Sequence, residues 1–151
     1  MKKLYAKSEI WFAVAWIIGY VVIVSTADNI SKNLGIEKIV TLPILIAMSA
    51  ILYFFVKKNG LTEKYGLCKS QLSAGRMLFY IPILVLLTAN LWYGVAMNLS
   101  PLETALYVLS MFCVGFLEEM IFRGLLFQAM AKDGVKAAII VSSVTFGIGH
   151  I

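Results

Sequence analysis

Three long stretches without a charged residue constrain the fold of this chain more than any other feature. They cover residues 10–27, 39–56 and 77–97, and each approaches the roughly 20 apolar residues that a helix needs to cross a bilayer. Only 14% of the residues are charged and 61% are hydrophobic, whereas soluble domains are about one quarter charged. The sequence therefore predicts an all-α fold, a polytopic transmembrane helix bundle.

Two further helices are predicted after these runs. Residues 100–103 read Ser-Pro-Leu-Glu, with serine at the N-cap, proline at the first helical position and glutamate at the third, which is typical of a helix start. This helix is expected near 101–131, before Lys-Asp-Gly breaks it, and another near 135–151. The first run exceeds the ~7–15 apolar residues of a signal peptide. We expect about five helices in a single membrane domain, 1–151.

The basic residues indicate topology rather than a nucleic-acid partner. The net charge is +5, but the cations gather at the N-terminus and in the segment 57–76 and do not form one face. That segment holds five basic residues and one acidic residue, and the positive-inside rule places such loops in the cytoplasm. The N-terminus is expected on the same cytoplasmic side.

Three ionisable residues interrupt the fourth predicted helix. Glu119 and Arg123 are four residues apart with the acid first, the favourable order for a helical ion pair. Glu118 points about 100° away from Glu119 on an α-helix, so it has no local countercharge. Ionisable groups at membrane depth usually serve function, and Glu118 is therefore a candidate general base.

His150 is predicted to lie at the depth of Glu118. Thirteen residues separate Glu118 from Ala131 and fifteen separate Val135 from His150, which correspond to about 20 Å and about 22 Å at ~1.5 Å per residue. On antiparallel neighbouring helices the two side chains would share one site. The bland alternative, in which a helix ends near Leu117 and the charges are solvated, is disfavoured by the apolar residues that follow.

The residues around these candidates carry a family resemblance. Residues 118–124, Glu-Glu-Met-Ile-Phe-Arg-Gly, and residues 146–150, Phe-Gly-Ile-Gly-His, resemble the first two motifs of the CPBP family. This family contains the type II CAAX prenyl proteases and the bacteriocin-immunity (Abi) proteins. The resemblance extends from about Leu102 onward. It implies that Glu118 and His150 activate a water for peptide hydrolysis, while Arg123 holds the site through Glu119.

The family pattern continues beyond what this sequence contains. A later histidine and an asparagine on a further helix are absent. The fifth predicted helix is also only about 25 Å long at ~1.5 Å per residue, which would leave the carboxylate of Ile151 in hydrocarbon, a costly position. We therefore expect an N-terminal fragment of a longer protein, or a degenerate member, that is truncated before the last motif and lacks part of the active site when taken by itself.

The expected function is that of an intramembrane endopeptidase, either a glutamic peptidase or a metallopeptidase. The expected location is the cell membrane, and the resemblance favours the bacterial plasma membrane. Its partners would be membrane lipid and peptide or membrane-associated protein substrates. A water activated without a metal is preferred, because zinc wants about four ligands and the adjacent glutamates diverge; if zinc is bound, Glu118 and His150 are the candidate ligands. The alternatives are a non-catalytic immunity or peptide-binding protein and, in a third class, a proton-coupled transporter.

Overall fold

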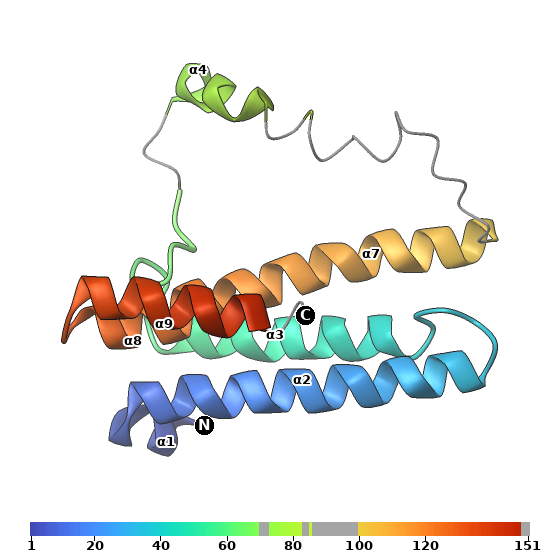
Figure 1. Ribbon diagram of the computed structural model, residues 1–151, viewed down its shortest axis with the longest axis horizontal. Helices are drawn as coiled ribbons and strands as arrows, with labels where there is room; N and C mark the ends of the chain where they lie inside the picture. Colours follow the sequence, from blue (N-terminus) through green and yellow to red (C-terminus); the bar gives the residue numbers. More distant parts are fainter. Residues whose placement is uncertain (70–72, 83–84, 86–99, 149–151) are drawn as a thin grey trace.

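The computed structural model describes residues 1–69, 73–82, 85 and 100–148, and these residues contain helices, turns and loops but no strand (Figure 1). Three of the described helices are long and apolar enough to cross a membrane: Glu9–Asn33, Thr41–Lys58 and Pro101–Ala131. The all-α membrane bundle predicted from the sequence is thereby confirmed.

The chain begins with a short helix, α1 (Lys2–Lys7), followed by the long helix α2 (Glu9–Asn33). Ser8 separates them in an extended conformation, and its Oγ accepts a hydrogen bond from the backbone N–H of Trp11 at 3.3 Å. Helix α2 continues six residues past the predicted run 10–27, so Asp28 lies inside the helix and not after its end. Asp28 stays in the helix because its carboxylate is satisfied by partners in the following turn.

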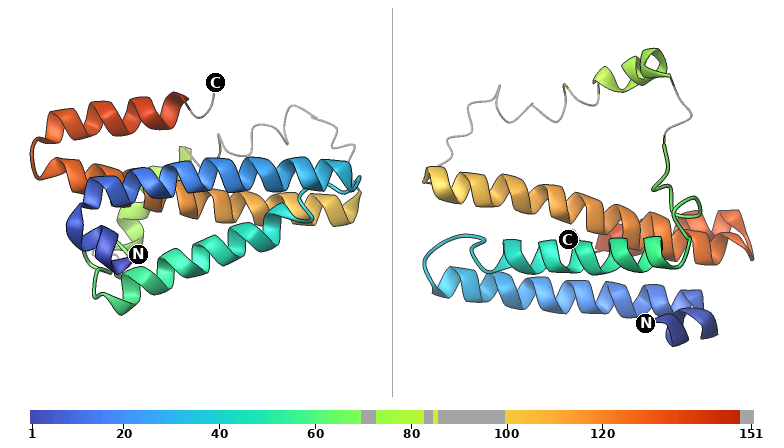
Figure 2. Two further views of the ribbon diagram at one scale, coloured as in Figure 1. Left: turned by 90° about the horizontal axis from the view of Figure 1, so that it is seen from below. Right: turned by 180° about the vertical axis from the view of Figure 1, so that it is seen from behind.

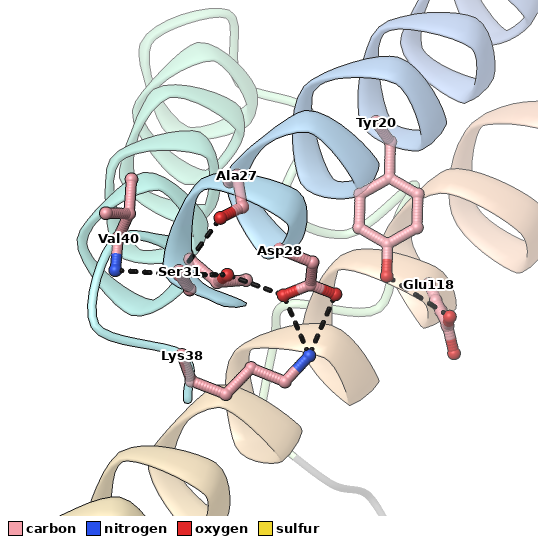
Figure 3. A network of polar contacts seen from close by, with 8 residues as sticks. Tyr20, Ala27, Asp28, Ser31, Lys38, Val40 and Glu118 are labelled. Carbon is pink, nitrogen blue, oxygen red and sulfur yellow. Dashed lines mark hydrogen bonds and ion pairs between the residues drawn. The ribbon is translucent and has the colours of Figure 1, made fainter. Parts of the chain in front are cut away.

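A polar cluster closes the connection between α2 and α3 (Thr41–Lys58). Lys38 Nζ lies 2.8 Å from Asp28 Oδ2 (Figure 3). The hydroxyl of Thr41 donates to Asp28 Oδ1 at 2.5 Å. The backbone N–H of Val40 donates to Ser31 Oγ at 3.1 Å. These contacts satisfy polar groups that would otherwise be costly inside an apolar bundle.

The next described segments are the short helix α4 (Ala74–Met77) and the 3-10 turn η1 (Leu78–Tyr80). Of the predicted third span, 77–97, the residues that the structure describes are 77–82 and 85, and these are helical. The remainder of this predicted span lies outside the described residues.

The second half of the described chain is a helical hairpin. α7 (Pro101–Glu118), the π-helix η2 (Glu119–Phe127) and α8 (Gln128–Ala131) follow one another without a break, and α9 (Val135–Ile148) returns alongside them. The capping box predicted at residues 100–103 is confirmed. The N–H of Glu103 donates to Ser100 Oγ at 3.2 Å, and the N–H of Ser100 donates to Glu103 Oε2 at 3.0 Å.

The core lies between α2, α3 and the segment α7–η2, with α9 on the outer side of η2 (Figures 1 and 2). Phe12 and Phe55 stack with their ring centroids 4.9 Å apart. The N-terminus, the end of α3 and the α8–α9 turn lie at the same end of the bundle, which we call the basic end after Lys64 and Lys132. The largest fully buried apolar side chains are those of Phe12, Leu45, Leu52, Val56, Leu117, Ile121 and Leu125.

The Asp28 cluster should contribute to stability. Replacing Asp28 by alanine leaves the Lys38 ammonium, whose side chain is only 14% exposed, without its carboxylate partner. We expect a loss of about 1–3 kcal/mol in the free energy of unfolding, the cost of an unsatisfied buried polar group. Thermal unfolding in detergent micelles, followed by circular dichroism, measures it. Asp133→Ala, at an exposed turn position, is the control, and equal melting temperatures for the two variants would contradict the expectation.

Candidate functional site

Glu118 is the last residue of α7, at the point where the helix changes from α to π geometry. The π-helix η2 covers nine residues, Glu119–Phe127. Such segments are rare and often mark functional sites. The predicted depth of Glu118, about 20 Å from Ala131, assumes α-helical rise along this whole segment and stays a prediction.

The carboxylate of Glu118 is half-buried and has a hydrogen-bond donor that the sequence analysis missed. The hydroxyl of Tyr20, on α2, donates to Glu118 Oε1 at 3.2 Å (Figure 3). Tyr20 is only 8% exposed. Its position inside the first apolar run could have indicated a buried polar contact, because a buried tyrosine hydroxyl usually has a hydrogen-bond partner. Glu118 thus has no nearby countercharge within its own helix, but its carboxylate accepts a hydrogen bond from another helix.

The ion pair predicted between Glu119 and Arg123 is present. Arg123 NH1 lies 3.2 Å from Glu119 Oε2 and 3.3 Å from Glu119 Oε1. The side chain of Arg123 is 77% exposed and that of Glu119 is 60% exposed. An ion pair this exposed contributes little to stability.

Two adjoining cavities surround these charges. The first, which we call the glutamate cavity, has a volume of about 340 Å³, and the second, the loop cavity, has a volume of about 530 Å³. Both are lined by Glu119, Arg123, Ser142 and Ser143, and Glu118 lines the glutamate cavity. The ionisable side chains therefore face hollows in the protein, as expected for charged groups within a membrane bundle.

The loop cavity is bounded on one side by residues 63–66, which follow α3. This loop is fixed by polar contacts at the basic end. Lys64 Nζ lies 2.8 Å from Glu9 Oε2, and Lys132 Nζ lies 2.9 Å from Glu9 Oε1. The hydroxyls of Tyr5 and Tyr65 are 3.0 Å apart. Burial acts to lower the pKa of Lys64, but its hydrogen bonds to Glu9 and Tyr5 outweigh that effect and the pKa is raised, so the ammonium stays charged at neutral pH.

Helix α9 forms the other wall of the glutamate cavity. Phe146 packs edge-to-face on Phe122, with ring centroids 5.3 Å apart. Among the described residues, Gly147 is not at a close approach to another helix, because a Cβ placed there would meet no atom outside its own helix within 4 Å. His150 lies outside the described residues, so its predicted pairing with Glu118 stays a prediction.

The residues that the structure describes do not form a cluster of metal ligands. No group of three or more histidine, cysteine, aspartate or glutamate side chains gathers among them, whereas zinc takes about four ligands. Glu118 and Glu119 both line the glutamate cavity, but Glu119 is paired with Arg123. A zinc site would therefore depend on His150 and on donors beyond the described side chains.

Comparison with known proteins confirms the family resemblance for the last part of the chain. Residues 100–151 match the family model described as type II CAAX prenyl endopeptidase Rce1-like. The matched region begins at the capping box before α7 and contains the whole segment from Glu118 to Arg123. No curated protein and no solved structure matches the chain.

The exposed Glu119–Arg123 pair should matter little for folding. Arg123→Ala is expected to change the free energy of unfolding by less than about 1 kcal/mol, the usual range for an exposed pair. Ile121→Ala, at a position with no exposed surface on the same π-helix, should cost about 2–5 kcal/mol. Thermal melts of the two purified variants would refute this view of the pair if both lost the same stability.

Proposed function

We propose, from the match of residues 100–151 to type II CAAX prenyl endopeptidases, that this chain carries catalytic residues of an intramembrane endopeptidase. The observation that carries the proposal is the position of Glu118. It is a half-buried carboxylate with one oxygen held by Tyr20, and it lines a cavity large enough for water and part of a peptide. Such a group is suited to act as a general base.

Hydrolysis by Glu118 needs two proton transfers. The carboxylate accepts a proton from a water in the glutamate cavity, and the resulting hydroxide forms a bond to the peptide carbonyl carbon. The tetrahedral intermediate then collapses, the C–N bond breaks, and the protonated carboxyl group gives its proton to the leaving amine. The family resemblance assigns His150 to water activation or to binding the oxyanion, and the Glu119–Arg123 pair to orienting the site.

The loop cavity is the proposed route for substrate. Its lining combines the charged Glu63 and Lys64 with the amide of Gln128 and the apolar ring of Phe127, a mixture that suits an extended peptide. The positive-inside rule puts this basic end in the cytoplasm. Substrates would then be peptides or membrane-associated proteins that enter from the cytoplasm, in a multi-pass protein of the bacterial plasma membrane. None of these lining residues indicates recognition of a prenyl group.

Replacing Glu118 by glutamine tests this proposal, because glutamine keeps the size of the side chain but cannot accept the proton. Peptide hydrolysis by the full-length protein should fall about 10²- to 10⁴-fold, the usual contribution of a general base. The assay uses proteoliposomes and a library of fluorogenic peptides, with and without a prenylated cysteine. Glu37→Gln, at a partly exposed position before α3, is the control. Full activity of the Glu118→Gln variant would overturn the protease assignment.

A non-catalytic peptide-binding or immunity protein is the second candidate, favoured by the two open cavities and the exposed ion pair. It predicts that Glu118→Gln leaves peptide binding and any protective phenotype intact while hydrolysis is absent from the wild-type protein as well. The same proteoliposomes, with labelled peptides and a binding readout, separate the two functions.

The proposed mechanism requires no metal. The full-length protein should keep its hydrolytic rate after treatment with a zinc chelator, because Glu118 can activate water directly. Elemental analysis of the purified protein accompanies the assay. Stoichiometric zinc whose removal abolishes hydrolysis, and whose return restores it, would establish a metalloendopeptidase and overturn the metal-free mechanism.

A further inference from the structure

Tyr20 connects the first half of the chain to the proposed base. It lies on α2, outside the segment 100–151 that matches the family model. Its hydroxyl donates to Glu118 Oε1 across 98 positions of sequence, and α2 packs directly against η2. In the part of the chain that the structure describes, no other hydrogen-bond donor reaches the carboxylate of Glu118.

The tyrosine is held in place by the packing of its own helix. Phe12, Ala13, Tyr20 and Ala27 are all buried. Tyr20 lies eight residues after Phe12, seven after Ala13 and seven before Ala27, and these spacings place the four residues on one face of an α-helix. This face lies in the core, where the side chains of Phe12 and Tyr20 are packed in one cluster with Ile121. The phenol ring therefore has little freedom to leave Glu118.

The other charged groups near this pair are already neutralised. Asp28, two turns further along α2, is paired with Lys38 at 2.8 Å, and Glu119 is paired with Arg123 at 3.2 Å. Glu118 has no such cation among the described residues. The phenol is thus the group that can fix the direction of this carboxylate.

We propose that Tyr20 is a positioning residue for Glu118: its hydroxyl holds Oε1 so that Oε2 is free to accept the proton of the attacking water. This inference rests on the proposed protease function. The tyrosine keeps its proton throughout, since Oε1 can accept its hydrogen bond whether Glu118 is ionised or protonated at Oε2. The transferred proton passes from water to Oε2 and from there to the leaving amine. A general base needs such a fixed direction, because misplacement of a reacting group lowers the rate steeply.

Tyr20→Phe is the direct test, because it removes the hydroxyl and keeps the ring that fills the core. In the full-length protein we expect kcat to fall about 10- to 100-fold, the worth of a hydrogen bond to a charged group, with KM within about twofold of wild type. Tyr53→Phe removes a tyrosine hydroxyl from an exposed position on α3 and should leave both constants unchanged. Thermal melts of both variants accompany the kinetics.

A second comparison separates positioning from a purely structural role. In the Glu118→Gln background, Tyr20→Phe should cause no further loss of residual activity, because the two residues act as one unit. An equal additional loss in that background, or a fall in kcat that follows a loss of folded protein, would overturn the inference. So would wild-type kinetics for Tyr20→Phe. If Glu118→Gln itself stays active, the protease function fails first, and this outcome is distinguishable from a failure of Tyr20 alone.

Discussion

The structure depends on one constraint, that polar groups inside an apolar bundle must find their partners within the protein or in a protein-lined cavity. Glu118 meets this requirement through the hydroxyl of Tyr20 and the glutamate cavity. Asp28 meets it through Lys38 and Thr41. In both cases the partner comes from a different segment, so satisfying the polar group also brings these segments together.

These contacts determine how α2 lies along the second half of the chain. At the basic end, Glu9 at the start of α2 contacts Lys64 from the loop and Lys132 from the α8–α9 turn. At the other end, the Asp28 cluster fixes the turn into α3. Between them, apolar packing of α2 on η2 places Tyr20 opposite Glu118. The polar contacts at both ends of α2 and the apolar packing between them are therefore all satisfied by one position of this helix.

The π-helix η2 supplies several of the residues that line the two cavities. Changing from α to π geometry directly after Glu118 widens the helix where Glu119, Arg123 and Gly124 line the cavities. The Glu119–Arg123 contact survives this change, since residues four apart remain neighbours in the wider helix. A motif that is read as a regular α-helix therefore predicts the correct ion pair, although the segment is a π-helix.

The sequence by itself determined the all-α membrane class, the start of the helix at Pro101, the Glu119–Arg123 pair and the family resemblance of the last segment. Each depends on local information, namely charge-free length, capping residues, four-residue spacing and contiguous motifs. Only the tertiary structure decided that Tyr20 is the partner of Glu118 and that α2 extends past Asp28. Both depend on contacts with other segments of the chain. Helix packing decides which residues meet there, and the spacing of residues along the sequence does not predict these partners.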